Sequence, residues 1–239
     1  TVIEAYADYQ FHLVYQRLHN FCVNEMGGFY LDIIKDRLYT TGADSRARRS
    51  AQTALYHIAH ALVRWIAPIL SYTADEIWEF LPGEREDSIF LVEWYPLATA
   101  QEIGSLDRGD WERVIAVRDA LNRELEVQRG EGLLKGGLDA AVVLYCDDSL
   151  LELLGRLGDE LRFVMITSVA EVAPLSNAPA DAAETELEGL RLQVSPCEFP
   201  KCERCYLRCE DVGSHAGHET ICGRCVENVD GDGEQRAVA

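Results

Sequence analysis

The stretch CERCYLRCEDVGSHAGHETICGRC, residues 202–225, determines how the C-terminal part of the chain folds. Four of its cysteines form two C-x-x-C pairs, Cys202/Cys205 and Cys222/Cys225, with 16 residues between the pairs. A C-x-x-C turn presents two sulfur atoms from one tight loop, and two such turns complete a tetrahedral site for Zn²⁺. The gap is within the range of paired zinc-binding turns. We therefore predict a Cys₄ zinc knuckle.

A closed site of four cysteines contributes folding energy and leaves no position for an activated water, so the expected zinc ion is structural. Iron is the chemical competitor because the same four thiolates suit a rubredoxin-like site, and the colour of the protein would separate the two metals. Four nearby side chains are alternative ligands that would break the symmetry of the paired turns: Cys197, Cys209, His215 and His218.

Composition limits the class of protein. The chain has 239 residues, of which 48% are hydrophobic, enough for a packed core. No apolar run approaches the length of a membrane helix, and the first residues do not have the pattern of a secretory signal. Six of the eight cysteines lie within residues 197–225 rather than in a disulfide framework, which fits a reducing cytoplasm.

The first half of the chain has helical periodicity. Apolar residues recur at helical spacing over residues 4–39, where Gly27 and Gly28 predict a break or kink. Residues 46–81 predict one long helix or two, depending on the effect of Pro68. A third amphipathic helix is expected over residues 107–132. These helices predict an antiparallel helical bundle.

The pattern then changes to short alternating elements. Strands are expected at residues 138–146, 162–169 and 187–196, with a helix over 148–161 and a surface loop over 175–186. This alternation is typical of a small α/β module. We expect a mainly α protein with three domains: a helical domain (1–132), a small α/β connecting module (133–196) and a zinc-binding domain (197–239).

Five stretches of the sequence together resemble one enzyme family, the isoleucyl-tRNA synthetases of bacteria. The resemblance is to the C-terminal part of these enzymes and runs from end to end of the chain. The segment WIAPILSYTADEIW (65–78) alone would indicate only the wider class of synthetases for branched aliphatic amino acids and methionine, and the two C-x-R-C turns narrow it. The stretches are FYLDIIKDRLYT (29–40), residues 48–83, LRFVMITS (161–168), the first C-x-R-C (202–205) and CGRCVENVDGDGEQR (222–236).

The resemblance implies an anticodon-binding helical domain, with Cys202, Cys205, Cys222 and Cys225 as zinc ligands and an isoleucine-accepting tRNA as partner. The family usually has Trp after the first C-x-x-C, where this chain has Tyr206. The family's H-I-G-H and K-M-S-K-S signatures do not occur here, so ATP and Mg²⁺ would belong to catalytic and editing domains outside this chain. We predict no catalytic residue, no membrane or DNA partner, and no tRNA charging by the chain alone.

The acidic composition, 41 acidic against 22 basic residues, is unfavourable for binding RNA. Charge is uneven, however, because residues 35–70 contain six basic and two acidic residues. A local basic region can contact phosphates while the acidic remainder discourages indiscriminate binding, although a solvated helix face is the alternative. The arginines inside the C-x-x-C turns are expected to face a partner. The predicted tRNA-binding residues are Arg46, Arg48, Arg49, Arg204, Tyr206 and Arg224.

Two other functions remain open from the sequence. One is a free-standing zinc-containing adaptor that binds other proteins and descends from a synthetase. The other is DNA damage binding, because DNA glycosylases carry a similar finger, but the acidic charge and the absence of catalytic signatures make it weak. The upstream reading frame would separate the adaptor from the synthetase.

Overall fold

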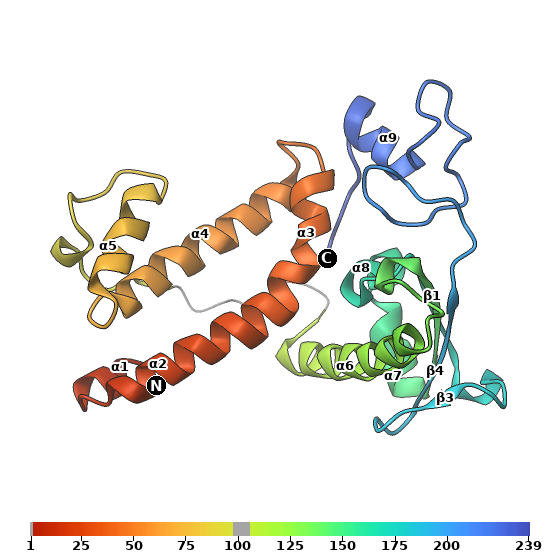
Figure 1. Ribbon diagram of the computed structural model, residues 1–239, viewed down its shortest axis with the longest axis horizontal. Helices are drawn as coiled ribbons and strands as arrows, with labels where there is room; N and C mark the ends of the chain where they lie inside the picture. Colours follow the sequence, from red (N-terminus) through yellow and green to blue (C-terminus); the bar gives the residue numbers. More distant parts are fainter. Residues whose placement is uncertain (1, 98–105) are drawn as a thin grey trace. The chain divides into compact units, whose positions relative to one another are not determined.

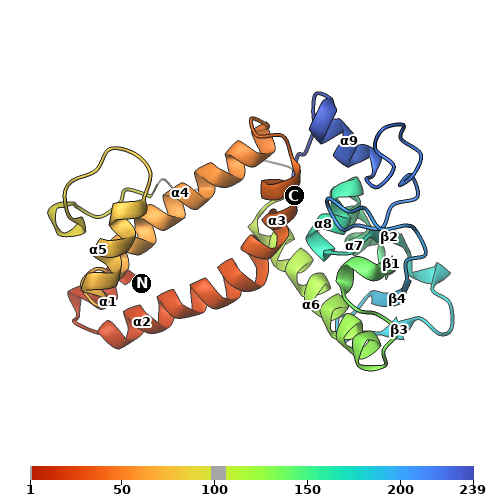
Figure 2. The ribbon, with the colours of Figure 1, turned by 45° about the horizontal axis from the view of Figure 1, so that its top comes forward.

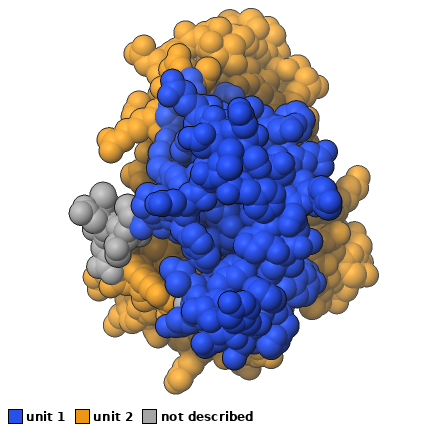
Figure 3. All heavy atoms as spheres, turned by 90° about the vertical axis from the view of Figure 1, so that its left-hand side faces the viewer, with its two compact units in different colours: residues 1–38, 48–100 blue, residues 39–47, 101–239 orange. Residues whose placement is uncertain are grey.

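A computed structural model describes residues 2–97 and 106–239, which are mainly helical with one small mixed sheet (Figure 1). The chain divides into two compact units (Figure 3). Unit 1 consists of Thr1–Leu38 and Arg48–Ala100, and unit 2 of Tyr39–Ala47 and Gln101–Ala239. Across the described ranges, no helix combines the length and the apolar character needed to cross a bilayer. The three-domain division and the antiparallel order of the helices stay predictions.

The first helical stretch is continuous where a break was predicted. Helix α1 (Val2–Ala7) is followed by α2 (Phe11–Asn20), a π-helical segment (Phe21–Tyr30) and α3 (Leu31–Thr40). The two adjacent glycines lie inside the π-helical segment, whose backbone stays helical. The expected kink at Gly27–Gly28 is therefore replaced by a local widening of the helix.

The second stretch forms two helices, α4 (Arg46–Ile66) and α5 (Ser71–Phe80). Pro68 lies between them, where its missing N–H and its ring prevent the helix from continuing. Trp78 of α5 is buried against Val63 and Ala67, and its indole nitrogen donates to the Glu86 carbonyl at 2.9 Å. This bond fixes residues 81–87. The chain then forms a 3₁₀ turn, Ile89–Leu91.

Unit 2 is built on helix α6 (Arg108–Gly130) and a four-stranded sheet of order β2-β1-β4-β3. Asp107 and Asp110 form a reciprocal capping box that starts α6. The helix packs against β4, α7 and α8 beside the sheet (Figure 2). The elements are β1 (Ala140–Cys146), α7 (Asp148–Gly155), α8 (Leu161–Met165), β2 (Val169–Pro174), β3 (Ala183–Glu184), β4 (Leu190–Pro196) and α9 (Gly223–Asp230).

Strands β1 and β4 confirm two of the predicted strands and pair antiparallel, with Leu144 opposite Leu192. The predicted strand over 162–169 is wrong. Residues Leu161–Met165 form helix α8, which ends at Ile166 in the left-handed conformation, and the parallel partner of β1 starts only at Val169. Most of α8 is buried, so its short apolar run lacked the polar face that marks a helix in sequence. The helix predicted over 148–161 correspondingly ends at Gly155.

A buried histidine lies in an aromatic cluster of unit 1. His60 is 4% exposed and stacks on Tyr95, with ring centroids 5.5 Å apart. The guanidinium of Arg64 contacts the Trp78 ring, and its Nη1 donates to the His60 carbonyl at 2.8 Å. Burial and the charge of Arg64, with a smaller effect of His57, lower the pKa of His60, although a hydrogen bond at Pro82 acts in the opposite direction. Neutral His60 therefore stabilises this part of the fold.

This lowered pKa predicts a pH dependence of stability. In the unfolded chain the imidazole takes up its proton near pH 6.5, whereas the folded chain does so only at lower pH. The stabilisation by neutral His60 is full above about pH 6.5, the pKa of the imidazole in the unfolded chain. It is lost as the pH falls from that value to the lower pKa of the folded chain. Urea unfolding at about pH 7.5 and about pH 5.5 should show a smaller loss of stability for His60→Gln than for wild type. The substitution itself should cost about 1 kcal/mol of stability at the higher pH.

His12→Gln, on the exposed side of α2, is the control, because it should leave the pH dependence of stability as in wild type. An equal pH dependence in wild type and His60→Gln would contradict the assignment.

Candidate functional site

The four cysteines of the two C-x-x-C turns converge on one point. The Sγ atoms of Cys202, Cys205, Cys222 and Cys225 all lie within 4.8 Å of one another, and all four residues are buried. The Cys202–Cys225 and Cys205–Cys222 sulfur pairs are each 3.8 Å apart. A tetrahedron with metal–sulfur bonds of about 2.3 Å has edges of about 3.8 Å. The geometry thus fits a metal ion bound by four thiolates.

Backbone hydrogen bonds shape the two turns. In the first turn, Cys202 N–H donates to the Leu207 carbonyl at 2.8 Å, and Tyr206 N–H donates to the Cys202 carbonyl at 3.0 Å. The second turn opens helix α9: Cys222 is its N-cap, and Cys225 lies in its first turn. Cys222 N–H points at the Cys202 sulfur at 3.4 Å. Helix α9 therefore directs its positive N-terminal end at the sulfur cluster, which favours thiolates.

The 16-residue connection between the turns is fixed by Asp211. Its carboxylate accepts from Gly223 N–H at 2.7 Å and lies 3.0 Å from His215 Nε2. A Cβ at Gly223 would approach the Asp211 oxygen to 2.7 Å, so a larger residue there would have to displace the Asp211 carboxylate. His218 pairs with Asp230 at 2.5 Å. Both histidines are engaged with aspartates and lie outside the four-sulfur group.

The two further cysteines also lie outside that group. Cys209 is half-buried, and contacts with Cys205 and Cys222 raise the pKa of its thiol. Cys197 is buried at the start of the segment that leads into the knuckle, where its N–H donates to the Asp139 carbonyl at 2.7 Å. The knuckle is also attached to the sheet module by Arg208, whose Nε contacts Asp139 at 2.9 Å.

The cluster does not hold four equivalent thiols without a cation. Contact with the Cys209 thiol lowers the pKa of Cys205 to about 5, and contacts with Cys205 and Cys209 lower that of Cys222. A contact with Cys205 raises the pKa of Cys225, and burial raises that of Cys202. Four closely spaced anions repel one another, so a divalent cation is required for all four to be ionised together.

The arginines inside the turns do not face outward as expected. Arg204 Nη1 donates to the Thr40 carbonyl at 2.7 Å and lies 3.7 Å from the Cys225 sulfur. Arg224 has a side chain that is 11% exposed, and it contacts Thr40 Oγ1 at 3.3 Å and Glu234 at 3.0 Å. All of these residues belong to unit 2. The prediction that both guanidiniums are free to meet a partner is therefore wrong.

The other predicted RNA-facing residues are more accessible. Tyr206 is 56% exposed and has φ of 66°, a left-handed backbone conformation that is uncommon outside glycine. Arg46 and Arg49 are exposed, and Arg48 is half-buried. Arg49 also contacts Gln52 at 3.0 Å. Arg64, counted in the same basic stretch, is committed to the aromatic cluster of unit 1.

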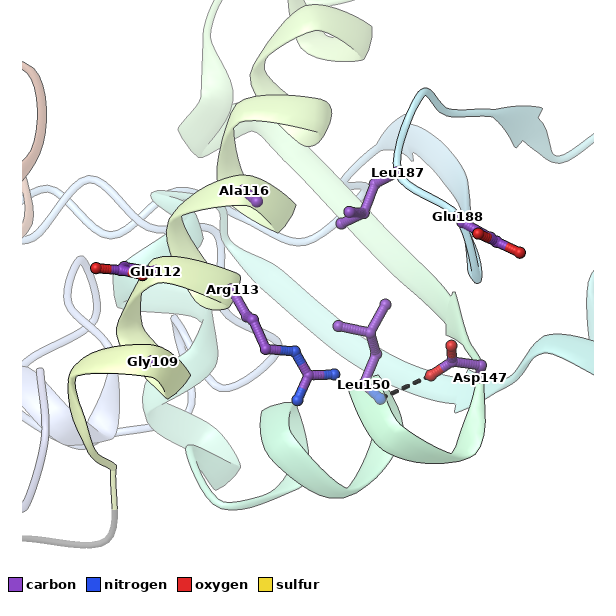
Figure 4. A pocket seen from close by; sticks show the side chains of 8 residues that line it. All are labelled: Gly109, Glu112, Arg113, Ala116, Asp147, Leu150, Leu187 and Glu188. Carbon is purple, nitrogen blue, oxygen red and sulfur yellow. Dashed lines mark hydrogen bonds between the residues drawn. The ribbon is translucent and has the colours of Figure 1, made fainter.

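A cavity of about 300 Å³ lies in unit 2 between α6, the start of α7 and residues 187–188 (Figure 4). Its polar groups have local partners: Asp147 accepts from Leu150 N–H at 2.8 Å, and Arg113 donates to Ser149. Figure 4 shows Glu112 pointing away from Arg113, on another side of α6. The contacts of Asp147 and Arg113 thus stabilise the fold around the cavity.

Sequence reasoning missed the partners of the arginines. Thr40 lies 164 residues from Arg204 and 184 residues from Arg224, and Glu234 lies 10 residues from Arg224. The only sequence signal for them is that Thr40 and Glu234 lie inside the stretches quoted for the family resemblance.

Comparison with known proteins gives consistent matches. Residues 1–144 match the family described as the anticodon-binding domain of tRNA ligase. The isoleucine–tRNA ligase of Nitrosococcus oceani is 57% identical over 239 residues, 100% of this chain and 25% of that protein. That of Stutzerimonas stutzeri is 59% identical over 237 residues, 99% of this chain and 25% of that protein. The chain spans about a quarter of the length of these relatives.

The sulfur geometry predicts that metal binding depends on each of the four cysteines. Cys202→Ser should lose the bound metal and increase proteolysis of residues 197–239, while the helices of unit 1 keep their unfolding behaviour. Elemental analysis and limited proteolysis measure the two effects. Cys197→Ser is the matched control, because it alters a buried cysteine of the same segment and should retain the metal. Retention of one full equivalent by Cys202→Ser would show that the ligand set is different.

Proposed function

The chain belongs to the anticodon-binding domain family of tRNA ligases, and from that membership we propose that it is the tRNA-binding part of an isoleucine–tRNA ligase. The observation that carries the proposal is identity of 57–59% to isoleucine–tRNA ligases along essentially the whole chain. The proposed partner is the anticodon region of an isoleucine-accepting tRNA. In the whole enzyme, catalytic and editing domains would use ATP and Mg²⁺ to activate isoleucine and attach it to this tRNA. The proposed location is the cytoplasm.

The proposed metal is one structural Zn²⁺ per chain. Sulfur–sulfur distances of 3.8 Å suit tetrahedral coordination, and four protein ligands leave no open position for substrate or water. The ion would supply the charge that lets four buried thiolates coexist, and it would hold the two turns together. Iron would suit the same ligands, but an iron–tetrathiolate protein is coloured and the zinc form is colourless.

The proposed tRNA surface combines two kinds of contact. Arg46, Arg48 and Arg49, at the start of α4, would contact phosphates, which position a nucleic acid without reading its sequence. Tyr206 would stack on a base of the anticodon loop, supported by its exposed ring and the nearby Lys201, whose Nζ is 5.2 Å from the ring centre. Arg204 and Arg224 remain candidates, and their buried contacts favour a supporting role. The proposed domains remain 1–132, 133–196 and 197–239.

The adaptor hypothesis explains less. It requires the helical part to have been separated from a synthetase. Isoleucine–tRNA ligases, however, match this chain over 98–100% of its length. DNA binding is supported only by the similarity of the finger to that of DNA glycosylases. The upstream reading frame is still the most direct test, because H-I-G-H and K-M-S-K-S signatures there would exclude a free-standing adaptor.

Replacing Arg48 and Arg49 with Ala in the full-length enzyme should weaken binding of cognate and non-cognate tRNA about equally. If each arginine neutralises one phosphate, the plot of log affinity against log salt should become shallower by about 1.4–1.8. Filter binding at several salt concentrations measures both effects. The matched control is Arg108→Ala with Arg123→Ala, which removes two exposed charges that form surface ion pairs. An unchanged slope in Arg48→Ala/Arg49→Ala would mean that this basic face is only solvated.

The isolated chain should not catalyse isoleucine-dependent ATP–pyrophosphate exchange. It lacks the two nucleotide-binding signatures of the family, and it covers about a quarter of the relatives' length. The assay compares the purified chain with the full-length enzyme at equal molar concentration. Exchange above background that persists through repeated purification would overturn the assignment of catalysis to other domains.

A further inference from the structure

Thr40, the last residue of α3, is held by both metal-binding turns. It is 4% exposed, and its carbonyl belongs to the last turn of the helix. Arg204, between Cys202 and Cys205, donates to that carbonyl at 2.7 Å. Arg224, between Cys222 and Cys225, donates to the Thr40 hydroxyl at 3.3 Å. Each C-x-x-C turn thus contributes one arginine that donates a hydrogen bond to Thr40.

The same guanidinium of Arg204 also faces the sulfur cluster. Its Nη1 lies 3.7 Å from the Cys225 sulfur. A divalent metal with four thiolates carries a net charge of −2 in a buried site, and such a charge is stable only with nearby cations or hydrogen-bond donors. Arg204 is therefore attracted to the loaded centre and to the helix terminus from one position.

Arg224 has further contacts besides the one with Thr40. The Arg224 guanidinium pairs with Glu234 at 3.0 Å and lies 5.0 Å from the centre of the Phe163 ring. The Cζ atom of Arg236 lies 3.7 Å from the centre of the same ring. These contacts fix the orientation of the Arg224 side chain, whereas the backbone of Arg224 belongs to the second metal-binding turn. The position of the hydroxyl contact on Thr40 thus depends on the fold of that turn.

We propose that Arg204 and Arg224 are positioning residues that connect metal occupancy to the order of residues 39–47. When the centre is loaded, both arginines hold Thr40, and the segment that carries Arg46 has a defined backbone. When the metal is removed, the two turns loosen, Arg204 and Arg224 move with them, and Thr40 is released. Contacts within the segment, such as Ser45 Oγ to Thr41 Oγ1 at 3.0 Å, do not involve the metal and persist. The inference rests on the metal centre proposed above and goes beyond its structural role.

Hydrogen–deuterium exchange of the complete 239-residue chain tests this coupling, with metal content measured in parallel. Removing the metal from wild type with a chelator should accelerate exchange of amides in residues 39–47 about tenfold, as expected for loss of a charged hydrogen bond. Metal-loaded Arg204→Gln should show a similar acceleration with its metal retained. Amides of β1, residues 140–146, should be unchanged in both and serve as the internal reference.

Two further variants make the outcome decisive. Arg208→Gln alters an arginine of the same knuckle that pairs with Asp139 rather than Thr40, so residues 39–47 should exchange as in wild type. Thr40→Val removes the hydroxyl while leaving the ligands untouched, and it should accelerate exchange several-fold even if Arg204→Gln fails to retain metal. Wild-type exchange at 39–47 in the chelated protein, or in metal-loaded Thr40→Val, would overturn the coupling. A wild-type chain that binds no metal would instead refute the metal centre itself.

Discussion

The C-terminal part of this chain depends on a cluster of buried sulfur atoms that repel one another once ionised. Four Sγ atoms lie within 4.8 Å of one another, and four thiolates at this spacing repel one another strongly. The 16-residue connection has little apolar material of its own, and its fixed points are polar contacts such as Asp211 with Gly223. A bound metal ion would offset the repulsion and take the place of an apolar core.

Charge around the sulfur cluster is balanced by a small number of polar contacts, of which those of Glu160 join residues far apart in the sequence. Glu234 pairs with Arg224 and Arg236, and the Arg236 side chain is only 1% exposed. The Glu160 carboxylate accepts three successive backbone N–H groups, from Ala237 to Ala239, at 2.6–2.8 Å. These bonds attach the last residues to the sheet module beside α8. In an acidic chain, the arginines of this region thus serve the folding of unit 2.

Sequence patterns predicted the elements that have a local signal. The cysteine spacing located the four sulfur atoms that meet in space, and helical periodicity located α4, α5 and α6. Prediction failed where burial removed the pattern, as in α8, whose apolar residues face the core on nearly all sides. It failed again for Arg204 and Arg224, because a turn spacing says nothing about a partner such as Thr40, which is more than 160 residues away. The direction of a side chain is set by tertiary contacts of this kind.

The packing of α6 bears on how the protein can be divided. The family match ends at residue 144, inside strand β1, whereas α6 packs against β4, α7 and α8, and all three of these elements lie beyond that point in the same compact unit. A fragment that stopped at residue 144 would keep α6 and lose β4, the antiparallel neighbour of β1. The apolar face of the helix, with Val117, Leu121 and Leu125, would then meet water. Sequence families delimit what is inherited together, and here a soluble, foldable piece has to extend through the sheet.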